Sequence, residues 1–246
     1  MFLKSARQAD TPNKLLPPPQ SWQELEQGLW WHQALREWLQ QEDPIVFGEY
    51  LFTYSGLEVP WVDSRVKAKY KIYLGPQADV QAELTALPIL KESADWAALP
   101  FVLEYSADPH QVLREVDRTL RTDGCMLIAM SNPYGLHSLA RLWPAWRNKK
   151  PWQSRLFTPA RVLDWLSLLN YQVIHKGYFG FAVPWPSRTG KAPAQSVFIR
   201  RFPFLAAGYV MIVRKREWPL TLVRQPQQSS RRVAEKGVVP AGRIPL

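Results

Sequence analysis

Residues 108–130 constrain the fold of this chain most, because they join a capped helix to an apolar run of strand length. Asp108 followed by Pro109 is a typical helix start, with a side-chain acceptor at the cap and proline at the first helical position. Apolar residues then recur at helical spacing, at Val112, Leu113, Val116 and Leu120. After a predicted turn at Asp123-Gly124 the run 125–130 (CMLIAM) is apolar throughout, as in a strand buried on both faces. The stretch predicts half of a βαβ unit and therefore a parallel sheet.

Helix and strand patterns alternate along the rest of the chain. A helix is predicted over 21–41, and another begins at Thr158-Pro159. The apolar positions of the first are Leu25, Leu29, Leu35 and Leu39. Strand patterns lie at 50–54, 69–74, 79–83, 94–103, 125–130, 171–178 and 207–213, of which 79–83 is a short alternating stretch. Strands that alternate with helices indicate a three-layer α/β sheet.

The length of 246 residues is enough for one α/β domain with a large core. We predict a flexible leader over 1–20, a domain over 21–222 with a Trp-rich basic insertion or lid at 134–156, and a basic disordered tail over 223–246. Without an apolar run of about 18 residues or an apolar signal core, the sequence predicts a cytoplasmic protein without a transmembrane segment. The single cysteine, Cys125, excludes a disulfide framework, and no histidine pair has metal-ligand spacing, so no metal site is predicted.

The formal net charge of +10 suggests two interpretations. Much of the excess lies near the C-terminus, where it either attracts RNA or another anionic partner or forms a solvated tail. The segment 143–152 combines tryptophans with basic side chains. It either stacks bases and pairs phosphates or forms a lid whose tryptophans pack on the sheet.

Several short runs resemble a known family. Those in the middle of the chain are Leu87-Pro88, Ser93-Ala94-Asp95, Leu103-Glu104, Asp108-Pro109-His110, Leu113-Arg114-Glu115 and Asp123-Gly124. They resemble class I S-adenosylmethionine (SAM) dependent methyltransferases. The later runs 154–158 (SRLFT), 164–171 (DWLSLLNY) and 219–222 (PLTL) resemble the YafS-like bacterial branch of that superfamily. Over about residues 45–215 the resemblance implies a Rossmann-like, doubly wound sheet, mostly parallel with an antiparallel last strand, and SAM as the cofactor.

The resemblance also implies where the cofactor binds. In this family the first strand delivers a glycine-rich turn to the cofactor, and the second ends in an acid that binds the ribose. The corresponding turn is Tyr54-Ser55-Gly56, with Tyr54 where the first glycine belongs, and the predicted second strand 70–75 (YKIYLG) offers no acid. Glu83 matches the acid that faces the adenine, with the Leu84 N–H beside it, although a solvated loop carboxylate is the alternative. Pro100 completes the implied cofactor contacts.

Candidates for the substrate side follow the predicted fourth and fifth strands. They are Glu104, Asn132, Tyr134, His137 and Trp143. Asn132-Pro133-Tyr134 partly matches the amine-binding (Asn/Asp)-Pro-Pro-(Tyr/Phe) tetrad, but it follows the fifth strand and lacks the second proline, so we interpret it as a turn. His137 is the best-placed general base, with a surface histidine as the alternative. Glu104 lies where open α/β sheets bind ligands, or it caps the next helix.

Two functions stay open at this point. The first is a SAM-dependent methyltransferase with an unidentified acceptor, since methyl transfer from a sulfonium requires positioning and exclusion of water more than a base. The second is a pseudo-enzyme that keeps the fold, has lost the cofactor site, and acts as a binding or RNA-interacting protein. Tyr54 and the missing acid motivate the second. The sequence identifies neither a catalytic residue nor an oligomeric state.

Overall fold

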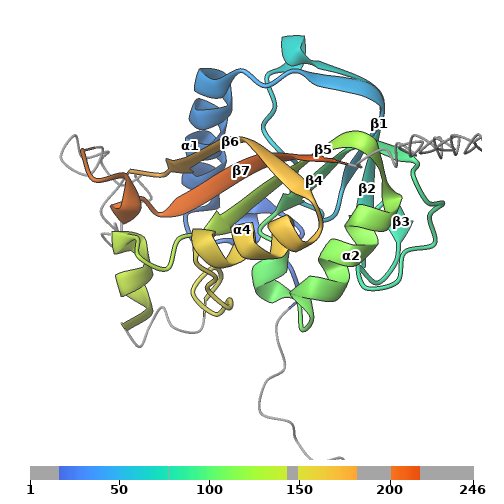
Figure 1. The fold of residues 1–246 in the computed structure, drawn as a ribbon. Coiled ribbons are helices and arrows are strands. Elements are labelled where there is room, and N and C mark those ends of the chain that lie inside the picture. Colours follow the sequence, from blue (N-terminus) through green and yellow to red (C-terminus); the bar gives the residue numbers. More distant parts are fainter. Residues whose placement is uncertain (1–16, 77, 143–148, 182–200, 217–246) are drawn as a thin grey trace, which may run out of the picture.

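A computed structural model of the protein describes residues 17–76, 78–142, 149–181 and 201–216 (Figure 1). Within these residues seven strands form one sheet in the order β3-β2-β1-β4-β5-β7-β6. The strands are β1 (Val46–Thr53), β2 (Val66–Gly75), β3 (Val80–Gln81), β4 (Ala94–Pro100), β5 (Leu120–Ser131), β6 (Tyr171–Phe179) and β7 (Gly208–Lys215). β7 runs antiparallel to β5 and β6, and the other neighbouring pairs are parallel. The predicted mostly parallel sheet with an antiparallel last strand is confirmed.

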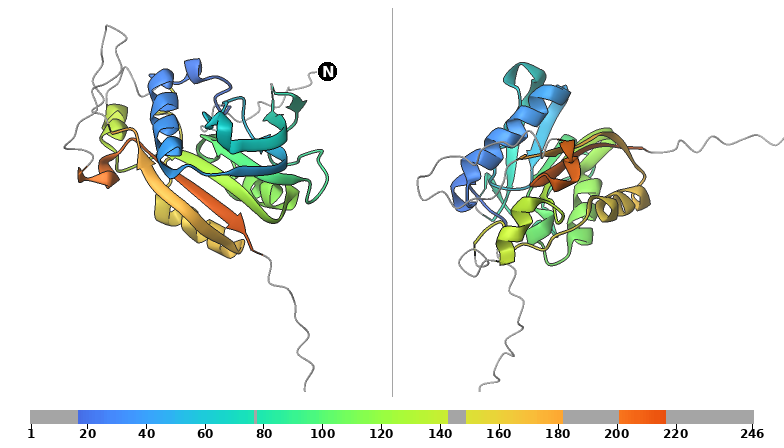
Figure 2. Two further views of the ribbon diagram at one scale, coloured as in Figure 1. Left: turned by 90° about the horizontal axis from the view of Figure 1, so that it is seen from above. Right: turned by 90° about the vertical axis from the view of Figure 1, so that its left-hand side faces the viewer.

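Helices cover both faces of the sheet. α1 (Gly28–Glu42) packs on one face, and α2 (Pro109–Thr119) and α4 (Pro159–Leu168) pack on the other (Figures 1 and 2). Side chains of a strand point alternately to the two faces of the sheet, and the side chains of β5 therefore enter both cores. Met126 and Ile128 join the core under α2 and α4, whereas Cys125 and Leu127 join the core under α1. The three-layer arrangement predicted from the sequence is therefore confirmed.

The helix-to-strand unit forms as predicted, with one difference. The Asp108 carboxylate accepts a hydrogen bond from the Gln111 N–H at 2.9 Å and caps α2. β5 begins directly after α2, at Leu120, and the predicted strand 125–130 is its second half. The predicted turn at Asp123-Gly124 lies inside β5, where the register against β4 shifts between Leu120 and Cys125. It is a local irregularity of the strand because the chain on both sides of it pairs with the same neighbour.

The buried face of the first helix agrees with the predicted one except at Leu29. Leu25, Leu35 and Leu39 are buried, whereas Leu29 is 79% exposed. Tryptophans on the helix, at Trp30, Trp31 and Trp38, are buried as well. The buried face of α1 therefore combines the predicted leucines with large tryptophan side chains, which bury much apolar surface.

Some predicted segments lie partly or wholly outside the described residues. They include Trp143, the basic tail 223–246, and all of the leader except residues 17–20. The described part of the insertion contains a short 3₁₀ helix, η4 (Leu136–Leu142). In the part of the chain that is described, no helix has the length and apolar character needed to span a bilayer.

Candidate functional site

The sheet has a topological switch point between β1 and β4. From β1 the chain moves outward to β2 and β3, and it then crosses over to β4 and β5 on the other side. Open α/β sheets bind ligands outside the carboxyl ends of their strands at such a point. The segments that follow β1 and β4 there contain Ser55, Gly56 and Glu104, which the sequence predicted as site residues. We call the space between the ends of β1, β2 and β4 the crevice.

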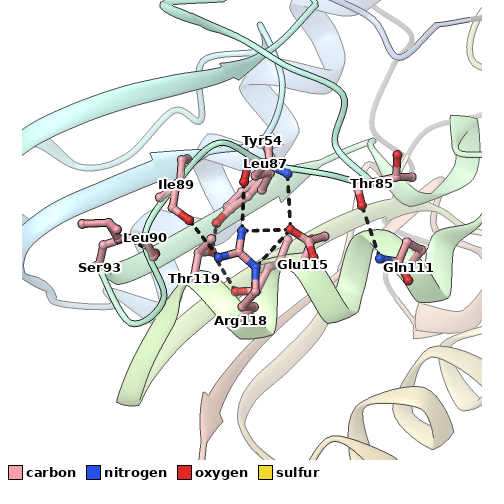
Figure 3. Close-up of polar contacts among 11 residues, drawn as sticks. Tyr54, Thr85, Leu87, Ile89, Leu90, Ser93, Gln111, Glu115, Arg118 and Thr119 are labelled. Atoms are coloured by element: carbon pink, nitrogen blue, oxygen red, sulfur yellow. Dashed lines mark hydrogen bonds and ion pairs between the residues drawn. The ribbon is translucent and has the colours of Figure 1, made fainter.

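Tyr54 does not line the crevice. Its N–H donates to the Ala98 carbonyl at 2.8 Å, so the residue still belongs to the pairing of β1 with β4. Its side chain is fully buried, and the phenol shares a hydrogen bond of 2.5 Å with the Thr119 hydroxyl at the end of α2 (Figure 3). Burial raises the pKa of Tyr54, which keeps the phenol protonated. Tyr54 therefore fills the core between the sheet and α2, away from the approach that a cofactor would use.

Gln20 fills the space beside two glycines at the crevice. A Cβ on Gly56 would lie 2.5 Å from the Gln20 backbone oxygen and 2.7 Å from its Oε1. A Cβ on Gly75, the last residue of β2, would lie 3.9 Å from the same Oε1. Gln20 was missed by the sequence reasoning because it belongs to the predicted leader, and no local pattern indicates a long-range contact with a glycine.

These residues provide a test of whether the crevice suits SAM. Gly56 and Gly75 form a cradle without side chains, and the Ser55 hydroxyl accepts from the Leu57 N–H at 2.8 Å to hold the turn. β2 ends without an acid, and Asp79 beyond it accepts from the Tyr73 N–H at 3.1 Å. The cradle thus fits a nucleoside when Gln20 is displaced, although the ribose-binding acid of the family is missing.

The other predicted cofactor residues lie near the same edge of the sheet. Glu83 is exposed and forms a single antiparallel bridge with Ala86 after β3. Leu84 is half-buried and packs against the core under α2 and α4. Pro100 is the buried last residue of β4. Glu83 and Leu84 could contact an adenine only while the loop that carries them stays in this position.

Arg118 holds that loop against α2. Its guanidinium donates to the carbonyls of Leu87 at 3.0 Å and Ile89 at 2.8 Å, and it forms an ion pair of 2.9 Å with Glu115 (Figure 3). The Glu115 carboxylate also accepts from the Leu87 N–H at 3.3 Å. Two side chains of α2 therefore position residues 87–89 and, with them, the loop that carries Glu83.

Replacing Arg118 with leucine is expected to lower the free energy of unfolding by about 1–3 kcal/mol, because it leaves two loop carbonyls and a half-buried carboxylate without their donor. Urea denaturation followed by circular dichroism measures the change. Arg114→Leu is the matched control, since Arg114 is exposed and donates to Gln111 on its own helix. Equal effects of the two substitutions would contradict a role of Arg118 in holding the loop.

Glu104 joins the segment after β4 to the end of β5. It is fully buried, and its two oxygens accept from the Ser131 N–H at 3.0 Å and from the Ser131 hydroxyl at 3.2 Å. Burial raises its pKa to about 8 in spite of these hydrogen bonds. Burial next to this carboxyl also raises the pKa of Tyr105 and of Tyr209. Burial therefore favours the neutral, protonated form of the Glu104 carboxyl at the carboxyl ends of the strands.

Asn132 forms the turn after β5. Its amide donates to the carbonyls of Phe204 and Ala206, both at 2.8 Å, and its oxygen accepts from the Tyr134 N–H at 3.1 Å. The side chain of Asn132 is thus occupied by backbone groups on both sides. Tyr134 is 62% exposed. The arrangement agrees with a turn and leaves no free group on Asn132 for a substrate amine.

His137 lies in a buried aromatic cluster. Its imidazole stacks between Trp30 and Trp152, with ring centroids at 5.7 and 5.0 Å and interplanar angles of 22° in both cases. Trp31 meets the same ring edge-on at 4.9 Å. His137 is 2% exposed, so the interpretation as a surface histidine is wrong. Burial lowers its pKa to about 3, which makes the ring neutral at physiological pH and a weak base.

Buried polar atoms without a hydrogen-bond partner gather around this cluster. In the described ranges, such side-chain atoms belong to residues 20–31 and to residues 137–153. The residues are Gln20, Gln27, Trp30, Trp31, His137 and Gln153, whereas the buried hydroxyls of Tyr105 and Ser154 interact with each other. Buried polar groups in folded proteins are nearly all paired, so a concentration of unpaired ones indicates a place where a ligand or ordered water completes the structure. Trp31 and Phe101 are 5.3 Å apart, which puts the cluster beside the switch point.

A cavity of about 560 Å³ opens at the opposite side of the sheet, at the amino ends of the parallel strands, among residues that include Asp95, Arg121 and Cys125. The Asp95 carboxylate there is already paired with Arg121 at 2.7 Å and accepts from the N–H groups of Glu49 and Tyr50. The amino ends of the strands are not where open α/β sheets bind ligands. We therefore place the candidate site at the crevice. Among the described residues no group of His, Cys, Asp and Glu side chains is arranged to hold a metal ion.

Comparison with known sequences shows which proteins this chain is similar to. Residues 61–128, which run from before β2 into β5, match a family model described as a methyltransferase domain. YafS of Escherichia coli K12, itself an uncharacterised protein, is 32% identical over 216 residues, which are 87% of this chain and 88% of YafS.

Solved structures of low sequence identity have the same fold. A SAM-dependent methyltransferase from Thermotoga maritima superposes with a TM-score of 0.53 at 14% identity, covering 75% of this chain and 91% of the other. A chain from the complex of the Haloferax volcanii Trm112 methyltransferase activator with a methyltransferase gives 0.55 at 12% identity, covering 76% and 90%. These similarities establish the fold, and the near-complete match to YafS establishes the family.

Proposed function

Since the chain belongs to the class I methyltransferase superfamily, in its YafS-like branch, we propose that it binds SAM in the crevice and transfers the methyl group to an acceptor held beside the aromatic cluster. The proposal rests mainly on one observation: buried polar atoms without a hydrogen-bond partner among the described residues lie next to the switch point. A ligand at this place would pair groups that otherwise stay unsatisfied.

The residues of the crevice have separate roles in this proposal. Ser55 and Gly56 present backbone to the cofactor, Pro100 closes the end of β4, and Glu83 with the Leu84 N–H faces the adenine. When bound, SAM supplies an electrophilic methyl group on a positively charged sulfur. The protein then has to orient the acceptor and keep out water.

The aromatic cluster and Glu104 supply the acceptor side. Trp30, Trp31 and His137 offer apolar ring surfaces, and the indole N–H groups of the two tryptophans are donors without partners among the described residues. Glu104, with a pKa of about 8, takes up or releases a proton near neutral pH, whereas neutral His137 binds a proton weakly. If the acceptor must lose a proton, Glu104 is better matched to that task than His137.

Isothermal titration with SAM and with S-adenosylhomocysteine (SAH) tests the cofactor part. We expect a binding heat and a rise in melting temperature for both ligands. Glu83→Gln should weaken binding by about tenfold, because one charge-assisted hydrogen bond to the adenine is lost. Glu49→Gln is the control, since Glu49 is an exposed acid in the first half of β1 and not in the segment that follows the strand. The absence of heat and of a thermal shift at millimolar ligand would contradict cofactor binding.

A second candidate function is favoured by Gln20 in the cradle and by the missing acid on β2. A pseudo-enzyme of this fold would bind no SAM and would act as a binding protein, with RNA as a partner through the basic-aromatic segment 143–152 and the tail, most of which lies outside the described residues. RNA binding of this kind weakens steeply with salt, in proportion to the phosphates neutralised. Salt-dependent RNA binding without SAH binding would favour this candidate over the first.

A further inference from the structure

We propose that residues 17–25, called the strap below, close the crevice in this structure, and that the cofactor binds only after Gln20 moves away from Gly56. This inference rests on the proposed function, because it concerns access to the same cofactor site. It differs from that function in assigning the chain a closed state that is held by its own N-terminal segment.

The contact that closes the crevice lies between backbone and backbone. The Gln20 oxygen and Cα would lie 2.5 and 2.9 Å from a Cβ on Gly56, so Gln20 rests directly on the face of Gly56 that has no side chain. The Gln20 Oε1 reaches the neighbouring Gly75 at the end of β2. A nucleoside lying across the ends of β1 and β2 would need the volume that Gln20 now fills.

Pro19 is buried in the tip of the strap, but the hydrogen bonds that Gln20 forms with other described residues do not tie the tip to the rest of the domain. In the described part of the chain, the hydrogen bonds of Gln20 go to the strap itself: its N–H donates to Glu24 Oε1 at 3.2 Å, and its Nε2 donates to the Pro18 carbonyl at 3.0 Å. Its Oε1 is buried without any partner. A buried unpaired amide oxygen disfavours the closed position, so a ligand has little to overcome in displacing it.

The base of the strap is anchored firmly. The Trp22 indole N–H donates to the Glu58 carbonyl at 2.9 Å, and the Trp22 ring lies edge-on to His32 and to Phe101. Leu25 is 3% exposed in the core under α1. Since the anchors lie at residues 22 and 25, the tip at residues 17–20 can leave the crevice while the domain stays folded.

The closed state also explains the small volume next to the crevice. A hollow of about 170 Å³ lies beside the end of β1 and is lined by residues that include Thr53, Glu58 and Tyr73. Cofactor sites in proteins usually measure several hundred Å³. Trp22 contacts His32 and Glu58, which both line this hollow, so the strap limits the space on that side as well.

Hydrogen exchange of the full-length protein with and without saturating SAH tests the movement without any need for an acceptor. We expect SAH to increase the exchange of the amides of residues 20–22, because opening the strap breaks the Gln20 N–H bond to Glu24. Ligands commonly protect the segments they touch, so an increase is diagnostic of displacement. Unchanged or slower exchange on SAH binding would overturn the proposal and would indicate that the strap completes the pocket.

Titration of Gln20→Ala provides the second measurement. Removing the side chain vacates the volume in front of Gly75 that the cofactor would need, and it breaks the Nε2 hydrogen bond to Pro18 that orders the tip, so SAH binding should tighten about threefold or more. Gln23→Ala is the matched control, since Gln23 lies on the same strap with an exposed side chain, and its SAH affinity should equal that of the unmodified protein.

The two measurements separate failure of the strap from failure of the proposed function. If the unmodified protein binds SAH and Gln20→Ala binds equally or more weakly, the strap does not oppose the cofactor, and the inference is overturned while the function stands. If neither protein gives a binding heat, the proposed function fails and the strap fails with it.

Discussion

Replacing Tyr54 with alanine is expected to lower the free energy of unfolding by about 3–5 kcal/mol and to leave the affinity for SAH no higher than before. Tyr54 is among the largest fully buried side chains, and it packs in the core under α2 and α4. Alanine would leave a cavity between the sheet and α2, and the Thr119 hydroxyl would lose its partner. Urea denaturation and isothermal titration measure the two effects.

Tyr54→Phe is the control for the packing part of this effect. Phenylalanine keeps the ring and removes only the hydrogen bond to Thr119, so we expect a loss of about 1 kcal/mol. The Thr119 hydroxyl would still donate to the Val116 carbonyl at 2.9 Å. If Tyr54→Ala created or improved SAH binding with little loss of stability, Tyr54 would be an obstacle in the crevice, which contradicts its place in the structure.

This prediction shows where the sequence and the structure differ on the cofactor site. The resemblance to the family places Tyr54 at a glycine position, which suggests a blocked turn. The side chain of a residue that still pairs with β4 can point into the core, and Tyr54 does so. What lies against the crevice is Gln20, some thirty residues earlier, and no spacing rule connects it with Gly56.

Local signals predicted most of the fold. The cap at Asp108 and the apolar run 125–130 identify α2 and β5, because a helix start and a buried strand depend on neighbouring residues. The predicted buried face of the first helix was wrong only at Leu29, because the tryptophans of α1 complete that face and only packing shows which apolar residues it takes. The burial of His137 also depends on Trp30 and Trp152, which come from distant segments of the chain.

The second large effect concerns stability as a function of pH, and it begins with Glu104. Its ordinary pKa near 4.5 rises to about 8 in the folded protein, so between these values the folded state binds more protons than the unfolded state. The free energy of unfolding therefore falls as pH rises from 4.5 to 8, by at most about 1.4 kcal/mol per pH unit. Glu104→Gln should abolish this fall, because the amide cannot ionise.

His137 acts in the opposite direction. Its ordinary pKa of 6.5 falls to about 3 on burial, so between these values the unfolded state binds the extra proton. The free energy of unfolding then falls as pH drops from 6.5 to 3. Between pH 4.5 and 6.5 the contributions of Glu104 and His137 have opposite slopes and largely cancel, which predicts nearly constant stability there.

Urea denaturation of the unmodified protein and of Glu104→Gln at several pH values separates the two groups. From pH 6.5 to 8 we expect the unmodified protein to lose about 2 kcal/mol and the variant to lose none of it. From pH 6.5 down to 4.5 the variant should lose about 2–3 kcal/mol, since the contribution of His137 is no longer opposed. Other titrating groups are common to both proteins, so the difference between the two curves isolates Glu104. If the stability curves of the two proteins ran parallel across the whole pH range, Glu104 would be ionised in the folded protein. It would then be no better matched to proton transfer near neutral pH than an ordinary surface carboxylate.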